Sequence, residues 1–323
     1  MTSPKIATAA DLASKLPTIR WLWPGWLPIG FVTILAGNPG VGKSMCALEL
    51  ARSVIEPADW PDRVKGPTNQ GYVLWCDTES SQALLSERIT TWKLPADRIL
   101  LPGNDPLATI SLSSQADRIA LIGSIKNFKP NMVVVDSLSA AHRGDENSTR
   151  DMKNVLDYLA QLARDENVAV LVVHHLRKKG MNESEEINLD RVRGSSVITS
   201  FARVVMAMER VGEGVRLSVI KNNLARLLKP LGITINDSGL TFGAAPERAS
   251  EPTKTDVAVS WLRKTLRDNP LPFKELEPKA KAHGISKRQL YNARDILGVK
   301  TEDGHWTLRS NPLVGVFGDT ETE

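Results

Sequence analysis

Residues 37–44 read Gly-Asn-Pro-Gly-Val-Gly-Lys-Ser and match the phosphate-binding pattern G-x-x-x-x-G-K-S/T. They lie between an apolar run, Phe31 to Ala36, and a helical pattern, Met45 to Ile55. The three glycines let the backbone curl so that several N–H groups face one anion, and the following helix directs its positive end there. The stretch therefore predicts a nucleoside triphosphate site between a strand and a helix.

Within this loop, Lys43 supplies a point charge for the β- and γ-phosphates, and Ser44 offers a hydroxyl to Mg²⁺. The expected cofactors are ATP and Mg²⁺. A glycine-rich turn that happens to carry a lysine is the alternative, and the strand and helix on either side argue against it. The residues expected to hold the nucleotide are Gly37, Asn38, Pro39, Gly40, Val41, Gly42, Lys43, Ser44 and Met45.

Three further apolar runs follow the first: residues 71–76, Met132 to Val135 and Val168 to Val173. Between the last two, residues 150–164 have apolar side chains at helical spacing. Strands that alternate with helices predict an α/β fold with a mostly parallel sheet, whose ligand lies at the carboxyl ends of the strands.

Shorter strands are expected after residue 201. They cover residues 202–209, 215–221, 231–235 and 240–242, and Gly-Glu-Gly and Asn-Asp-Ser-Gly provide hairpin turns between them. The sheet is therefore expected to continue with an antiparallel extension.

The domain organisation follows from a change of composition near residue 245. Residues 1–245 form the expected main domain, and residues 246–255, rich in Ala, Pro, Glu and Ser, form a linker. Residues 256–310 contain three helical patterns, at 256–267, 273–282 and 286–297, and then a hairpin at 299–308. This order is typical of a winged helix-turn-helix, and residues 311–323 form a tail.

The third helix of this segment begins at Ser286 and carries polar side chains that could contact a groove or phosphates. They are Lys287, Arg288, Gln289, Tyr291, Asn292 and Arg294. Residues 253–310 hold twelve Lys/Arg against seven Asp/Glu, a surplus of +5, whereas the chain as a whole carries +4, so the remaining residues are close to neutral. A polyanion-binding module is expected, although such small helical domains also mediate protein contacts.

Carboxylates at strand ends are the candidate catalytic groups. Asp136 closes the strand Met-Val-Val-Val, as a Walker B acid does, and is expected to hold Mg²⁺ together with Ser44. Glu79 follows the strand that ends at Cys76 and is the expected base for the attacking water. Asp77 is the second candidate, and a simple acid at a helix N-terminus is the structural alternative.

His174 and His175 end the fourth strand. A histidine there can respond to the γ-phosphate, and His175 is the favoured one, although a buried structural histidine is also possible. The polar stretch 179–190, which follows the basic residues Arg177 and Lys178, is expected to be a mobile loop that can touch nucleic acid, or simply a surface loop.

Composition limits the remaining possibilities. The chain has 323 residues and no run of eighteen apolar residues, so no membrane span is expected. Its first residues lack a basic segment followed by an apolar one, so no secretion signal is expected either. The expected location is therefore cytoplasmic. The two cysteines of the chain, Cys46 and Cys76, are expected to be small core residues. Trp21, Trp23 and Trp26 are expected to pack in the core or an interface rather than on a base.

The phrase Arg193-Gly194-Ser195-Ser196 follows, and Arg203, Lys221 and Asn223 complete the series of motifs. Over residues 18–242 their order resembles the RecA-like hexameric ATPases, above all the plasmid replicative helicase RepA and the related AAA-type ATPases of phages and mobile elements. The resemblance implies catalytic roles for Lys43, Glu79, His175, Arg203 and Lys221. In this family Asp136 corresponds to Walker B, and Arg203 to an arginine finger. Several mobile-element relatives also resemble the chain at its C-terminus.

The function expected from these motifs is an ATP-hydrolysing, DNA-dependent helicase or translocase of a phage, plasmid or mobile element. It would form a homo-oligomeric ring, a hexamer by the resemblance, and hydrolyse ATP at subunit interfaces. Single-stranded DNA would pass through the ring of ATPase domains, and duplex DNA would bind the C-terminal domain. The alternative is a nucleotide-switched DNA-binding regulator or helicase loader without unwinding, and a kinase on a P-loop scaffold has little support because no acceptor site is evident.

Overall fold

The fold is described from a computed structural model, over residues 8–11, 18–141, 149–177, 187–192, 196–248, 254–267 and 269–308. These residues form two compact units that divide between Arg248 and Ala249. The division falls inside the predicted linker at 246–255. Each unit is described by itself.

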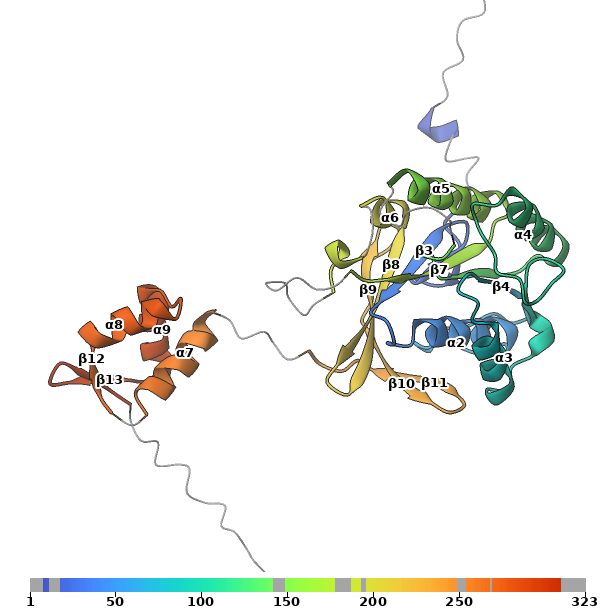
Figure 1. Cartoon of the computed structure of the whole chain (residues 1–323). Helices are drawn as coiled ribbons and strands as arrows, with labels where there is room; N and C mark the ends of the chain where they lie inside the picture. The colour runs from blue at the N-terminus through green and yellow to red at the C-terminus, as the bar shows by residue number, and fades with distance from the viewer. Residues whose placement is uncertain are drawn as a thin grey trace, which may run out of the picture. The chain divides into compact units, whose positions relative to one another are not determined.

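The first unit contains one large sheet and the helices that cover it (Figure 1). In chain order its elements are β1 (Trp21–Trp23), β2 (Leu27–Pro28), β3 (Val32–Gly37), α2 (Lys43–Ile55), β4 (Val73–Asp77), α3 (Gln82–Thr91), η1 (Ala96–Arg98), β5 (Ile99–Leu100), α4 (Gln115–Phe128), β6 (Met132–Asp136), α5 (Thr149–Asp165), β7 (Ala169–His175), η2 (Leu189–Arg191), α6 (Ser196–Phe201), β8 (Val204–Val211), β9 (Gly214–Asn222), β10 (Leu231–Asn236) and β11 (Gly239–Ala244).

The sheet has nine strands among the described residues, in the order β11-β10-β9-β8-β3-β7-β6-β4-β5. Pairing is parallel from β8 to β5 and antiparallel from β8 to β11. The predicted parallel sheet with an antiparallel extension is therefore confirmed. Strand β3, which leads into the loop at 37–44, lies between β7 and β8.

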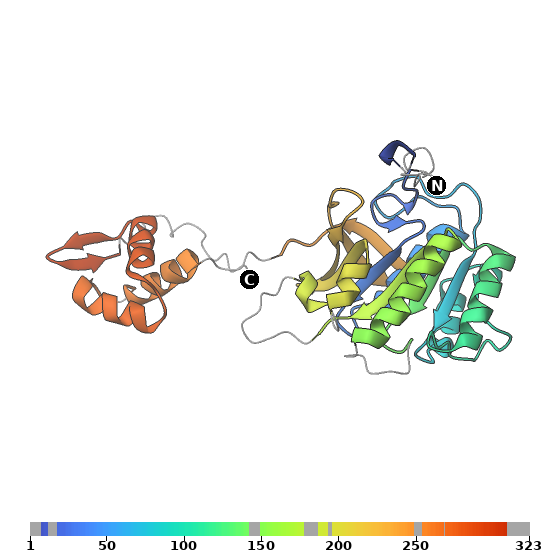
Figure 2. The ribbon, with the colours of Figure 1, turned by 90° about the horizontal axis from the view of Figure 1, so that it is seen from above.

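Helices cover both faces of this sheet. Helices α2 and α3 lie on one face, and α4, α5 and α6 lie on the other (Figure 1; Figure 2 looks onto the second layer). Alternate residues of β3 serve the two layers, because Leu35 packs toward α2 whereas Ile34 and Ala36 pack toward α5. Since both faces are buried, the parallel strands are continuous apolar runs, which explains why they could be found in the sequence.

Strand register brings the polar strand ends together. Gly37 pairs with His175 on β7 and with Met208 on β8, and Asp77 on β4 pairs with Asp136 on β6. The carboxyl ends of the parallel strands therefore meet at one edge, directly beside the loop that follows β3.

Three tryptophans form a buried stack on the α2 face. The ring centroids of Trp23 and Trp26 are 4.5 Å apart, and those of Trp23 and Trp60 are 5.3 Å apart. Trp23 Nε1 donates to Asp62 Oδ1 at 3.0 Å, and all three side chains are buried. The expectation of core packing for Trp23 and Trp26 is confirmed. Cys46 and Cys76 are buried free thiols, as expected, and burial raises the pKa of each to about 12.

The second unit is small and has its own core. It contains α7 (Lys254–Thr265), β12 (Leu271–Pro272), α8 (Phe273–Ala282), α9 (Lys287–Leu297), β13 (Lys300–Glu302) and β14 (His305–Thr307), and its three strands pair in the order β12-β14-β13. Leu262, Leu276, Leu290 and Trp306 are buried together. The predicted helices and hairpin are present, with bounds that differ by one or two residues.

Helix α9 begins with a capping box. The Ser286 hydroxyl accepts from the Gln289 N–H, and Gln289 Oε1 accepts from the Ser286 N–H at 2.7 Å. The Gln289 side chain, one of those expected to contact a groove, therefore also serves to begin the helix. Arg288 and Asn292 are exposed and lie four residues apart, so they share one side of α9. No helix among the described residues is both long and apolar enough to span a membrane.

Replacing Trp23 by alanine is expected to destabilise the first unit by about 3–5 kcal/mol, because the ring is fully buried between two others. Denaturant unfolding measures this change. Leu107→Ala is the control, since Leu107 is 74 % exposed and should change stability by less than about 0.5 kcal/mol. Equal effects of the two substitutions would contradict the buried stack.

Candidate nucleotide and metal site

The loop at 37–44 has the backbone that anion binding needs. Gly40 and Gly42 have φ angles of 72° and 96°, in the left-handed region that favours glycine. Gly37 is required for a different reason. A Cβ atom there would lie 2.8 Å from Val41 Cγ1 and 2.9 Å from the Met208 carbonyl oxygen, so only glycine fits between the loop and β8.

Helix α2 begins at Lys43, within this motif, with Gly42 as its N-cap, no side-chain cap and no acidic residue in its first turn. The N–H groups of that turn are therefore not covered by a carboxylate of the helix itself, and they carry the positive end of the helix dipole. Loop and helix together fit a phosphate group.

Lys43 is a buried cation. Its side chain is 5 % exposed, and its Nζ donates to the Asn38 carbonyl oxygen at 3.0 Å. Burial lowers the pKa of Lys43, whereas the nearby Asp136 and Glu79 carboxylates raise it. A buried ammonium needs opposing charge. A phosphate in the loop would supply more of that charge, so Lys43 fits the nucleotide it was predicted to bind.

Asp136 and Ser44, the two predicted metal ligands, lie together. Asp136 is 5 % exposed, and the Ser44 side chain is close enough to lower its pKa. Burial raises the pKa of Asp136 to about 6. Glu79 and Asp77 also raise it, whereas Ser44 and Lys43 lower it. A buried carboxylate beside two other carboxylates is stabilised by added positive charge, and oxygen atoms are the ligands that Mg²⁺ prefers. Mg²⁺ therefore fits this set of donors.

Glu79 and Asp77, the two candidate bases, differ in their environment. Asp77 is 3 % exposed, and its two carboxylate oxygens accept from the backbone N–H groups of Glu79 at 2.9 Å and Ser81 at 2.7 Å. Asp77 therefore holds the turn after β4. Glu79 is 43 % exposed at its side chain and accepts a hydrogen bond from the Ser137 hydroxyl. The geometry favours Glu79 as the group that could contact water.

His175 faces this carboxylate. Its Nε2 atom lies 3.6 Å from Glu79 Oε1, which is an ion-pair distance rather than a hydrogen bond. Contact with His175 and the Ser137 hydroxyl lowers the pKa of Glu79, against the effect of partial burial, so Glu79 is ionised at neutral pH. His174 is only 2 % exposed, whereas the His175 side chain is 27 % exposed. The exposures therefore favour His175 over His174 for contact with a ligand.

Arg203 and Lys221 are brought together, but far from their own loop. Val204 pairs with Thr33 and with Asn222, and Val205 pairs with Lys221. Arg203 therefore lies at the amino end of β8, five residues before Met208, which pairs with Gly37. At roughly 3.3 Å per residue this separation is about 17 Å, too long for an arginine side chain to cross.

Lys221 also has a structural contact that the sequence did not reveal. Its Nζ donates to the carbonyl oxygens of Thr199 at 2.5 Å and Ala202 at 2.9 Å, at the end of α6. Burial lowers the pKa of Lys221, as does the charge of Arg203. A cation at a helix C-terminus offsets the negative end of the dipole, so Lys221 connects β9 to α6.

Other predicted features lie partly outside the described residues. Residues 179–186 of the expected loop are outside them, as are residues 193–195 of the Arg-Gly-Ser-Ser phrase. Residues 187–190, expected to belong to a mobile loop, include Ile187, which is 3 % exposed and packs in the core under α5. That end of the loop is therefore folded, because an apolar side chain is buried there.

Asp136→Asn should stabilise the metal-free protein by about 2–3 kcal/mol at pH 8, since one pKa unit corresponds to about 1.4 kcal/mol. The folded state raises the pKa of Asp136 from 3.8 to about 6, so the folded state binds this proton more tightly than the unfolded state. The cost of ionisation is absent below about pH 4 and grows as the pH rises through 6. Urea unfolding with a chelator at pH 4.5 and pH 8 measures the difference.

Asp77→Asn is the matched control and should have the opposite sign, by about 1–3 kcal/mol, because one oxygen cannot accept both backbone N–H groups as two do now. Stabilisation by Asp77→Asn, or a pH-independent effect of Asp136→Asn, would contradict the assigned environments.

Comparison with known proteins agrees with this site. Residues 2–181, more than half of the chain, match the family model AAA_25, described as an AAA domain. The chain is also similar to DNA repair protein RadA. It is 27 % identical to that of Streptococcus pyogenes serotype M3 over 165 residues, which are 50 % of this chain and 31 % of the relative.

The corresponding values for RadA of Bacillus subtilis (strain 168) are 24 % over 184 residues, 56 % of this chain and 35 % of the relative. RadA of Mycobacterium tuberculosis is 28 % identical over 165 residues, which are 50 % of this chain and 30 % of the relative. The chain thus spans about a third of the length of the curated relatives it matches. Its large, mostly parallel sheet fits a RecA-like P-loop fold, and the family match supports ATPase activity. The chain belongs to the AAA_25 family of AAA domains.

Proposed function

We propose that this chain is a DNA-dependent ATPase that acts as a ring-forming helicase or translocase of a phage, plasmid or mobile element. One observation carries the proposal: Arg203 and Lys221 lie side by side at the end of β8 and β9 that is remote from the chain's own loop. A cation predicted to stabilise transferred phosphate, yet unable to reach its own pocket, fits a site in a neighbouring copy.

The roles within one pocket follow from the contacts described above. The loop and Lys43 hold the phosphates, and Ser44 and Asp136 would hold Mg²⁺, which supplies positive charge to the phosphate oxygens when bound. Glu79 is ionised and partly exposed, so it can accept a proton from an attacking water. His175 contacts Glu79 and begins the stretch toward residue 177, so it can transmit a change at the carboxylate to the chain beyond β7.

The neighbouring copy would complete this pocket through Arg203. Its charge would stabilise the transition state only where two copies meet, which makes hydrolysis depend on assembly. Lys221 would position Arg203 by joining β9 to the end of α6. We expect a closed, head-to-tail ring, and the resemblance to hexameric ATPases favours six copies.

DNA is the proposed partner. The similar RadA proteins are named for DNA repair, and the segment 253–310 carries surplus positive charge. We propose that single-stranded DNA contacts the ring and that the second unit is a winged helix-turn-helix, with α9 presenting Arg288 and Asn292 to duplex DNA. Arginine and asparagine are the side chains best suited to guanine and adenine edges.

The second candidate is a nucleotide-switched regulator or loader that binds duplex DNA without separating its strands. The exposed side of α9 favours this possibility. Sequence-specific duplex binding by the full chain, lost in Arg288→Ala, together with no strand separation, would favour the regulator over the motor.

Glu79→Gln should lower the rate of ATP hydrolysis by about 10²–10⁴-fold and leave ATP binding intact, since it removes only the proton acceptor. Lys43→Ala should abolish binding. Single-stranded DNA should stimulate hydrolysis by the unaltered chain. Glu87→Gln, an exposed glutamate on α3, is the control and should change neither quantity. A Glu79→Gln protein that hydrolyses ATP normally would show that another group acts as the base.

Arg203→Ala should lower ATP hydrolysis by about 10³-fold or more, because it removes a charge at the transition state. An equal mixture of Arg203→Ala and Lys43→Ala chains should regain activity. About a quarter of the seams in a randomly mixed ring would then pair an intact pocket with an intact arginine. Arg164→Ala, which removes an exposed arginine of α5, should remain active. The proposal would be contradicted if the mixture stayed inactive and dilute single copies hydrolysed ATP as fast as the assembly.

A further inference from the structure

The strand order fixes the direction in which a nucleotide must extend from the loop. The groups suited to the γ-phosphate and its water lie at the ends of β4, β6 and β7, on one side of β3. Asp136 ends β6, His175 ends β7, and Glu79 follows the end of β4 by two residues. If the γ-phosphate lies there, the α-phosphate, the ribose and the base lie toward the other side. That side is formed by β8 and the antiparallel strands β9, β10 and β11.

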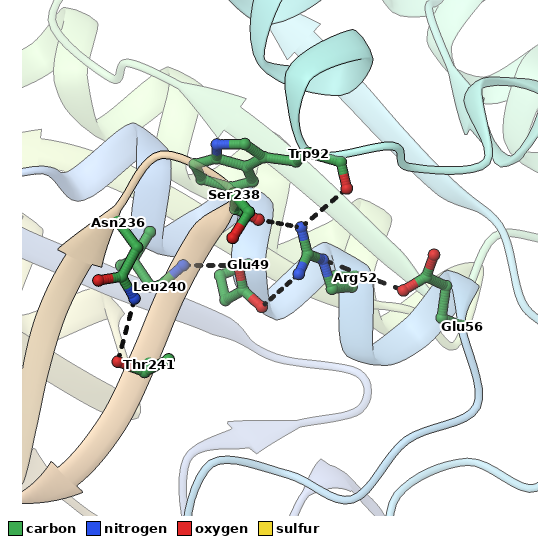
Figure 3. A network of polar contacts seen from close by, with 8 residues as sticks. All are labelled: Glu49, Arg52, Glu56, Trp92, Asn236, Ser238, Leu240 and Thr241. Atoms are coloured by element: carbon green, nitrogen blue, oxygen red, sulfur yellow. Dashed lines mark hydrogen bonds and ion pairs between the residues drawn. The ribbon is translucent and has the colours of Figure 1, made fainter.

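The β10–β11 hairpin lies against α2 on this second side (Figure 3). The Leu240 N–H donates to Glu49 Oε2 at 3.0 Å, and Arg52 Nη2 donates to the Ser238 carbonyl oxygen at 2.9 Å. Arg52 also donates to the Trp92 carbonyl oxygen at 3.2 Å, so one guanidinium joins α2, α3 and the hairpin. Gly239, at the tip of the hairpin, has a φ angle of 138°, a backbone conformation that favours glycine.

Two side chains from these strands reach the loop itself. Ile235 of β10 is a large apolar residue that is 38 % exposed, and its Cδ1 atom lies 3.2 Å from where a Cβ of Gly42 would stand. Arg210 of β8 is exposed, and its Nη2 atom lies 3.5 Å from the Gly40 carbonyl oxygen. An exposed isoleucine beside an anion site makes no favourable contact with phosphates. The apolar side chain of Ile235 and the guanidinium of Arg210 instead suit the flat face and the polar edge of a base.

We propose that Ile235 and Arg210 form the nucleobase subsite, with Ile235 packing on one face of the base and Arg210 contacting its ring or edge. Arg52 and Glu49 are positioning residues, which act by holding the hairpin on α2. This inference rests on the proposed nucleotide binding and adds the residues that distinguish a nucleotide from a bare triphosphate.

The test compares the binding of ATP and of inorganic tripolyphosphate, each with Mg²⁺, by calorimetry on the full chain. The unaltered protein should bind ATP more tightly. Ile235→Ala should weaken ATP about tenfold and leave tripolyphosphate unchanged, because only the base loses a contact. Ile119→Ala, an equally apolar residue of α4 that is 63 % exposed, is the control and should change neither affinity.

Arg52→Ala should weaken ATP with the same selectivity, and Arg52→Lys should recover part of the loss because its ammonium can still donate to the Ser238 carbonyl oxygen. Equal weakening of both ligands by Ile235→Ala would overturn the subsite, since Ile235 would then act through the loop backbone. If the unaltered chain bound both ligands equally, the subsite would fail while phosphate binding stood. If it bound neither, the proposed function itself would fail.

Discussion

The site depends on the interaction of the buried Lys43 ammonium group with its surroundings. A cation with 5 % of its surface exposed needs opposite charge or hydrogen-bond acceptors around it. Here the charges are those of Asp136 and Glu79, and the acceptor is the Asn38 carbonyl oxygen. They come from the loop after β3, from the end of β6 and from the turn after β4. The parallel register of β3, β7, β6 and β4 is what brings them to one place.

The same register divides the chemistry between two ends of the sheet. The groups proposed to bind phosphate and to exchange protons stand at the carboxyl ends of the parallel strands, whereas Arg203 stands at the amino end of β8. One copy therefore carries the proposed nucleotide site at one end and a pair of cations at the other. Head-to-tail contact between copies would join the two ends, and hydrolysis would then report on assembly.

Much of this could be predicted from sequence, because the informative elements are locally encoded. The loop at 37–44, the apolar strands and Asp136 at the end of β6 were found, since a strand buried on both faces is a continuous apolar run. Choices that depend on tertiary contacts could not be found. Two of these contacts join segments that are distant in the sequence: the hydrogen bonds of Lys221 to the end of α6 and the approach of Ile235 to the loop. The third is the cap formed by Gln289, a residue type that is equally common on an exposed helix surface.

A structure of the assembled protein with Mg²⁺ and a non-hydrolysable ATP analogue tests the central claim most directly. The account predicts that Arg203 of each copy lies within hydrogen-bonding distance of the γ-phosphate held by Lys43 of the next copy. An Arg203 side chain far from every bound triphosphate, in its own copy and in adjacent ones, would contradict it.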